Sequence, residues 1–220
     1  MKKEILYHGS PVIVDNPEYG KGNIYNDYGR GFYCTNHIEL AKEWAVGKNV
    51  DGYLNKYEID LEGLKILDLL DEIHHILHWL ALLLKYRRFE TKQPVAATGK
   101  EYILDHYLID TSEFDLIVGY RADDSYFQFA KDFLNNTISL KQLENAMKLG
   151  DLKEQYVLIS PKAFERIKYT SSEIVMKDGY YDKRFQRDQN ARAKYMESLK
   201  EIDANGIFMR DIINGVDIHG

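Results

Sequence analysis

Tyr7-His8-Gly9-Ser10 ends the first apolar stretch of this sequence, and Gly29-Arg30-Gly31-Phe32-Tyr33 opens the next one further along the chain. We interpret the two stretches as facing walls of one pocket. Glycine lets a flat ligand lie against the main chain, while His and Ser side chains offer hydrogen bonds of either sense. A Tyr leaving the second strand can cover the other face of such a ligand. The pattern therefore favours a site for an aromatic ring that carries a carboxamide.

The composition is that of a globular protein with one substantial core. The chain has 220 residues, of which 45% are hydrophobic and 29% are charged, and this size fits one domain with an appendage. After Met176 the sequence becomes highly polar, so we predict a domain over residues 1–176 and a mostly helical C-terminal appendage over residues 177–220. We expect the appendage to dock on the domain; a partner-binding arm is the alternative.

Charge, cysteine content and hydropathy limit the function classes. A formal net charge of −6 argues against general nucleic-acid binding, because phosphate contacts need a basic surface, although a local basic patch remains compatible with it. The single cysteine, Cys34, cannot form an internal disulfide and places no demand on an oxidising compartment. The start lacks a signal-peptide pattern, and the longest apolar stretch, residues 76–84, is too short to span a membrane. We therefore predict a cytoplasmic protein without a membrane partner.

Hydrophobic patterning predicts strands and helices in mixed order. Strands are expected over residues 4–8, 31–35, 52–61, 64–69, 114–120, 155–159 and 166–170, and helices over residues 37–47, 70–90, 100–109, 126–134 and 139–149. The strands at 52–61 and 64–69 should be neighbours or form a hairpin, and residues 91–99 should form a loop. Asn36 is expected to cap the first helix, with Glu39 completing a capping box.

Two histidines on the longest predicted helix invite a metal-site interpretation. His74 and His78 are four residues apart and therefore share a helical face. They lack a third ligand or the intervening acid of a zinc protease motif. We therefore interpret them as solvated or capping residues.

The paired glycine-flanked motifs resemble the His-Tyr branch of the ADP-ribosyltransferase superfamily, which includes the poly(ADP-ribose) polymerases. Over most of residues 4–168, the sequence also resembles DUF3990, a bacterial domain family of unknown function, notably in residues 26–35 and 119–127. These resemblances imply an α+β fold with a split, mainly antiparallel sheet and surrounding helices. They also imply NAD as the substrate, with no metal, because nicotinamide is already a good leaving group.

The superfamily resemblance assigns roles to both motifs. His8 would bond a ribose hydroxyl in the adenosine half of NAD, and the Gly9 main chain would grip the carboxamide with support from Ser10. Tyr33 would stack on nicotinamide, and Gly31 belongs to the same cofactor-binding set. The alternative is that His8 and Tyr33 merely finish their strands.

The third position of the superfamily signature departs from the pattern. A Glu usually begins a later strand, and Gln155 stands at the matching place; glutamine can bond the ribose 2′-hydroxyl but contributes no negative charge. Three accounts remain open: slow mono-ADP-ribosyl transfer, an acid supplied by Glu154, Asp123 or Asp124, or a nucleotide-binding module without turnover. Glu154 should point to the opposite face of its strand. Arg121 could hold a phosphate or order the acid, and a helix cap with an ion pair is the alternative for this cluster.

The leading hypothesis is an NAD-dependent mono-ADP-ribosyltransferase that modifies a protein or nucleic-acid acceptor. Relatives imply a bacterial toxin or defence role, with an antitoxin or regulatory partner. The alternatives are a noncatalytic NAD or ADP-ribose binding module and an NAD glycohydrolase, in which water is the acceptor. A dehydrogenase is disfavoured because no glycine-rich fingerprint lies between a strand and a helix.

Overall fold

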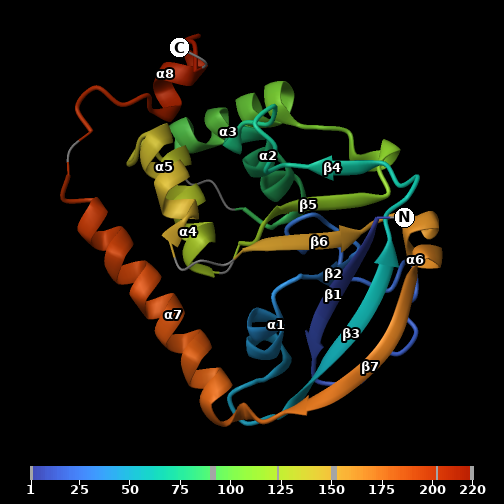
Figure 1. The fold of residues 1–220 in the computed structure, drawn as a ribbon. Helices are drawn as coiled ribbons and strands as arrows, with labels where there is room; N and C mark the ends of the chain where they lie inside the picture. The colour runs from blue at the N-terminus through green and yellow to red at the C-terminus, as the bar shows by residue number, and fades with distance from the viewer. Residues whose placement is uncertain (1, 90–92, 123, 150–152, 202, 219–220) are drawn as a thin grey trace.

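The structure is a computed structural model that describes residues 2–89, 93–122, 124–149, 153–201 and 203–218. The described chain has a mixed α+β fold with two sheets (Figure 1). In spatial order, the first sheet contains β1 (Lys3–Ser10), β3 (Gly52–Asp60) and β7 (Ile167–Val175), and the second contains β2 (Phe32–Cys34), β6 (Glu154–Leu158), β5 (Leu116–Tyr120) and β4 (Ile66–Asp68). All pairs are antiparallel except β4 with β5. The predicted α+β class is confirmed.

The described helices pack against both sheets. They are α1 (Ile38–Ala45), α2 (Ile76–Tyr86), α3 (Pro94–Tyr107), α4 (Asp124–Leu134), α5 (Leu140–Met147), α6 (Pro161–Arg166), α7 (Lys177–Ser198) and α8 (Met209–Ile213). Helix α1 packs on β1 and β3, while α2, α3, α4, α5 and α8 surround the larger hydrophobic core. Among the described residues, no helix is both long and apolar enough to cross a membrane.

Strand β5 explains how the two cores meet. Its residues Leu116, Ile117 and Val118 are all buried. Because successive strand residues face opposite ways, Leu116 and Val118 join the core between the sheets, while Ile117 joins the helical core. A run that is apolar at every position is therefore what a strand with both faces covered requires.

The predicted pairing of residues 52–61 with residues 64–69 is wrong. Strands β3 and β4 lie in different sheets, and β4 runs parallel to β5 with Leu67 opposite Ile117. The reason is that alternating apolar residues report which face of a strand is buried and carry no information about its neighbour.

Helix α2 begins later than the predicted residue 70, because a histidine cap precedes Ile76. His75 Nδ1 accepts a hydrogen bond from the Leu77 amide at 3.2 Å, and His78 Nδ1 accepts one from the His75 amide at 3.0 Å. Interpreting His78 as a capping residue is thus confirmed. Among the described residues, no group of three or more His, Cys, Asp or Glu side chains is arranged to hold a metal ion.

Two other helix starts differ from the predictions. Helix α3 begins at Pro94, inside the predicted loop. Proline suits the first turn of a helix, because the backbone amide hydrogen that it lacks would have no partner within the helix there. Helix α1 has His37 at its N-cap, without a side-chain cap. Asn36, the predicted cap, instead donates from Nδ2 to Glu154 Oε1 at 2.8 Å.

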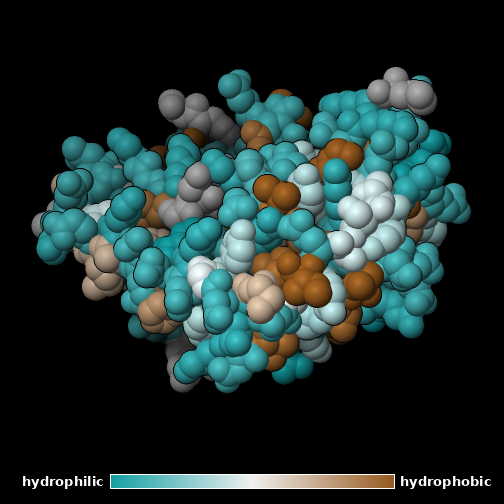
Figure 2. All heavy atoms as spheres, turned by 60° about the horizontal axis from the view of Figure 1, so that its bottom comes forward, coloured by the Kyte–Doolittle hydropathy of each residue, from teal (hydrophilic) through white to brown (hydrophobic). Residues whose placement is uncertain are grey.

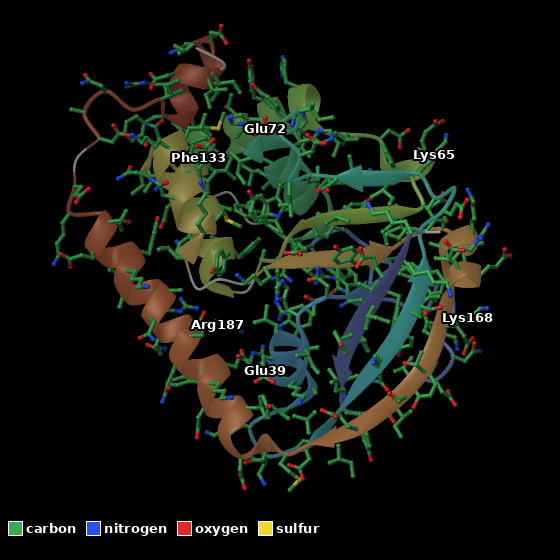
Figure 3. All side chains as sticks on the ribbon, viewed as in Figure 1. Glu39, Lys65, Glu72, Phe133, Lys168 and Arg187 are labelled. Atoms are coloured by element: carbon green, nitrogen blue, oxygen red, sulfur yellow. The ribbon has the colours of Figure 1, made fainter. Side chains whose placement is uncertain are left out.

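The C-terminal segment packs against the remainder of the fold, as expected for docking. Tyr195 on α7 is buried and donates its hydroxyl to Asp132 on α4 at 2.7 Å. Met209 and Ile212 of α8 are also buried in the helical core. Figure 3 shows Arg187 extending from α7 toward α1, where its Nη2 lies 2.7 Å from Glu43 Oε2.

The face of the molecule drawn in Figure 2 is mainly hydrophilic, with a small group of apolar side chains near its centre.

Candidate functional site

Strand β1 is joined directly to the residue that follows the end of β2. Tyr7 and Thr35 exchange backbone hydrogen bonds of 2.7 and 2.9 Å. One residue further along β1, the His8 imidazole donates from Nδ1 to the Tyr33 carbonyl oxygen at 2.7 Å. Burial lowers the pKa of His8, against the opposing effect of this bond. His8 is therefore neutral near pH 7, and its Nε2 is an acceptor.

The phenol of Tyr33 is fixed by its own loop. Its hydroxyl donates to the Gly29 carbonyl at 2.7 Å and accepts from the Tyr28 amide at 3.1 Å. Gly29 has φ of +76°, a conformation that glycine adopts readily. Burial raises the pKa of Tyr33, so its hydroxyl stays protonated. Tyr33 thus contributes a rigid aromatic wall.

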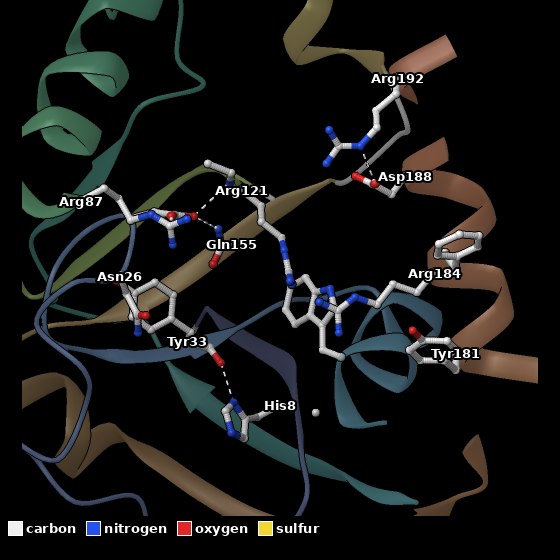
Figure 4. Close-up of a pocket in the computed structure, with 15 residues that line it drawn as sticks. His8, Asn26, Tyr33, Arg87, Arg121, Gln155, Tyr181, Arg184, Asp188 and Arg192 are labelled. Atoms are coloured by element: carbon white, nitrogen blue, oxygen red, sulfur yellow. Dashed lines mark hydrogen bonds and ion pairs between the residues drawn. The ribbon is translucent and has the colours of Figure 1, made fainter. Parts of the chain in front are cut away.

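Both side chains line a cavity of about 620 Å³, a volume typical of small-molecule sites. Figure 4 shows α7 on one side of this cavity, and Asn26 and Arg87 on the other. The sequence-predicted residues in its lining are His8, Gly9, Tyr33, Arg121 and Gln155. The lining residues that sequence reasoning missed are Asn26, Asp27, Trp44, Arg87, Ala122, Tyr181, Arg184, Phe185, Asp188 and Arg192.

Two predicted ligand-binding residues lie outside this lining. Ser10 is buried, donates its hydroxyl to the Val12 carbonyl and accepts from Asn55 Nδ2 at 3.1 Å, so it organises the loop after β1. Gly31 lies against β6, where an added Cβ would come within 2.6 Å of Val157 Cγ1. These contacts give both residues a structural reason to be present.

The predicted acids have different outcomes. Asp123 lies outside the described residues. Asp124 begins α4, but its side chain is outside the described part of the chain. Glu154 is absent from the cavity lining, in keeping with the expectation that it faces away from Gln155.

A buried carboxylate that was not predicted lies beside Gln155. Asp27 Oδ2 accepts from the Ala122 amide at 2.9 Å and from Gln155 Nε2 at 3.4 Å, while Oδ1 lies 3.5 Å from Arg87 Nη1. Burial raises the pKa of Asp27, and the Ala122 amide, Arg87 and Arg121 oppose that shift. The available signal was its position two residues before the second motif, within residues 26–35, which resemble DUF3990.

The neighbouring carboxylate orients the Gln155 amide. Reversing that amide would bring its oxygen against a carboxylate oxygen, which is electrostatically unfavourable. With the nitrogen bonded to Asp27, the Gln155 oxygen is turned the other way, toward the cavity (Figure 4). Gln155 therefore presents a hydrogen-bond acceptor, as a carboxylate at this position would.

Comparison with protein families matches residues 4–169 to DUF3990, described as a protein family of unknown function. The chain belongs to the DUF3990 family. This confirms the resemblance to DUF3990 that the sequence shows over most of residues 4–168. No curated protein and no solved structure matches the chain significantly.

The DUF3990 match ends before α7, yet α7 supplies one side of the cavity. Its contribution includes Arg184 and Arg192, which lie with Arg87 and Arg121 in the same lining. Arg192 Nε bonds Asp188 Oδ2 at 2.7 Å, and the Arg121 guanidinium lies over the Trp44 ring, 3.8 Å from its centroid. Four arginines against two aspartates give the cavity a positive balance within a chain of net charge −6.

Proposed function

We propose that this DUF3990 protein is an NAD-dependent mono-ADP-ribosyltransferase that modifies a macromolecular acceptor. One observation carries the proposal. His8, Tyr33 and Gln155 come from three strands, β1, β2 and β6, and line a single cavity. The superfamily resemblance assigns roles to these three residues from sequence, and residues so distant along the chain need not meet in the fold.

The geometry suits each proposed role. A neutral His8 can accept a hydrogen bond from a ribose hydroxyl at Nε2, because its Nδ1 already donates to the Tyr33 carbonyl. The Tyr33 ring, held at its hydroxyl end by Gly29, is a fixed surface on which nicotinamide can stack. In the reaction, the bond from ribose C1′ to the nicotinamide nitrogen breaks, and the bonding electrons leave with neutral nicotinamide. An acceptor nucleophile then bonds C1′ and releases its proton to solvent.

Asp27 supplies a carboxylate next to Gln155, the position at which the superfamily usually has a glutamate. Its carboxylate holds Gln155 so that the amide oxygen can accept the ribose 2′-hydroxyl, and it adds a negative charge behind that amide. A correctly placed charge in a water-excluded site is worth on the order of 10²- to 10³-fold in rate. We therefore assign Asp27 as a positioning residue and propose that the pair fulfils the role of a single Glu.

Labelled NAD tests the activity. The full chain is incubated with NAD labelled in its adenylate half, together with a bacterial lysate as the source of acceptors. Label on a macromolecule with release of nicotinamide supports the transferase. Free ADP-ribose with nicotinamide identifies a glycohydrolase, and bound but intact NAD identifies a binding module. Absence of both binding and turnover refutes every NAD-based function.

A charge relocation tests the Asp27–Gln155 pair. Asp27→Asn should lower kcat by about 10²-fold, and adding Gln155→Glu to that variant should restore much of the loss by returning a carboxylate to the cavity. Asp105→Asn is the matched control, because Asp105 is exposed on α3. Failure of Gln155→Glu to restore any activity in a folded double variant would count against the pair.

A second function remains supported by one observation. Gln155 itself is uncharged, which favours a noncatalytic NAD or ADP-ribose binding module if Asp27 does not compensate. The toxin or defence role, the antitoxin or regulatory partner and the cytoplasmic location remain predictions from sequence.

A further inference from the structure

Helix α7 is anchored to the fold along one face. Arg187 forms its ion pair with Glu43 of α1, and both side chains are largely buried. Further along, Ala191 is buried and Tyr195 bonds Asp132 of α4. These contacts occur at two separate places along the helix, so they fix its orientation as well as its position.

The adjoining face of α7 is directed at the cavity. It presents Tyr181, Arg184, Phe185, Asp188 and Arg192, at spacings of three, four, seven and eleven residues from the first. Such positions lie on one side of a helix. The anchoring contacts described above therefore hold a continuous polar and aromatic stripe against the site (Figure 4).

The chemistry of this stripe suits an anion attached to an aromatic group. Arg184 is partly buried and forms no hydrogen bond or ion pair with any residue in the described ranges. Arg192 is held by Asp188 on the same face. Between the two arginines in sequence is Phe185, whose side chain is 55% exposed. A guanidinium without a protein partner in a pocket is suited to phosphate, which it binds through paired hydrogen bonds.

We propose that the cavity face of α7 is the binding surface for a nucleoside diphosphate group, with Arg184 and Arg192 contacting the phosphates and Phe185 stacking on the base. The inference rests on the proposed function, since NAD carries a diphosphate between its two nucleosides. It places part of the substrate site outside the region matched to DUF3990, in the segment that composition separates as an appendage.

The test uses ADP, which contains the diphosphate and base but no nicotinamide. Isothermal titration should show ADP binding to the full chain, with about tenfold weaker affinity in Arg184→Gln and again in the double variant with Arg192→Gln. Lys194→Gln makes the same charge change on another face of α7, where Lys194 is exposed and outside the cavity lining. It should bind ADP like the wild type. Thermal unfolding confirms that each variant is folded.

Inorganic pyrophosphate separates the two halves of the proposed surface. Phe185→Ala should weaken ADP but not pyrophosphate, whereas the arginine variants should weaken both. Unchanged ADP affinity in the double arginine variant, or no ADP binding by the wild type, overturns the proposal. Equal weakening of ADP and pyrophosphate by Phe185→Ala overturns the stacking assignment.

The ADP-binding test and the NAD-turnover test can fail independently of each other. Nicotinamide release by a protein whose double arginine variant binds ADP normally would reject the α7 surface and leave the transferase intact. Loss of ADP binding in that variant, with no turnover of NAD by the wild type, would support the surface and reject the transferase.

Discussion

Substituting Gly9 by Ala should displace α1 from β1. A Cβ at Gly9 would lie 1.9 Å from the Ala41 carbonyl oxygen and 2.6 Å from the Ala45 amide nitrogen, whereas ordinary contacts begin at 3.4 Å. Both obstacles are helix backbone atoms, which cannot rotate away as a side chain can. The helix as a whole must therefore shift by more than an ångström, or the strand must bend.

The expected cost is large for a single methyl group. Overpacking a dense interior typically costs about 1–3 kcal/mol, and contact with backbone places Gly9→Ala at the upper end, about 3 kcal/mol. For a chain of this size each kcal/mol corresponds to about 2–4 °C in melting temperature, so the expected fall is roughly 6–12 °C. The measurement is urea unfolding, supported by thermal unfolding, without ligand.

Gly47→Ala is the matched control. An added Cβ at Gly47 meets only Val50 Cβ, at 3.9 Å, and its φ is not positive. Its unfolding free energy should change by no more than about 0.5 kcal/mol. Equal unfolding midpoints for the two variants would refute the close packing of α1 on β1. Because no ligand is present, the comparison isolates this packing role from any carboxamide contact at Gly9.

Three further predictions concern stability and reactivity. Cys34 is fully buried and burial raises its pKa, so a thiol reagent should label it in urea but scarcely in the native protein; rapid native labelling would contradict the buried position. Tyr195→Phe removes the 2.7 Å bond to Asp132 and should lower the free energy of unfolding by about 0.5–1.5 kcal/mol, whereas an unchanged value would mean that this bond does not hold α7. Burial raises the folded-state pKa of Asp27 above its unfolded value, so its contribution to stability is greatest below about pH 4 and falls as the pH rises through the folded pKa. The difference in unfolding free energy between the wild type and Asp27→Asn should therefore vary with pH above about pH 4. A difference that stays constant with pH would contradict the raised pKa of Asp27.

Local signals were sufficient to locate the strands that build the site. The ends of β1 and β2 carry Gly9 and Gly31 next to apolar runs, and β6 begins with Glu154 beside Gln155. These features are contained in a few consecutive residues, so they can be recognised without knowing the fold. The pairing of β4 with β5 has no such local signature, because parallel neighbours are joined through a long connection.

Asp27 was missed for a different reason. In sequence it is one of several polar residues in a segment that has the composition of a loop. Its importance depends on Ala122, Arg87 and Gln155, which approach it from distant parts of the chain. The departure at Gln155 indicates a need for a nearby acid, but the acids that stand out in the sequence are those next to β5 and in β6. We propose Asp27, which lies two residues before the second motif, as the acid that meets this requirement.

The C-terminal helix shows why a composition boundary can divide a site. Periodicity detects a helix by its apolar stripe, but α7 is anchored mainly through Arg187 and Tyr195 and presents Arg184 and Arg192 to the cavity, so polar groups fill positions where an apolar stripe would be sought. Such a helix resembles an appendage when only hydropathy is considered. The anchoring contacts and the cavity stripe lie on adjoining faces, and one helix therefore docks on the fold and forms a wall of the site at once. A boundary drawn at residue 176 would preserve the two motifs while removing Arg184 and Arg192, the two arginines that we propose for phosphate binding.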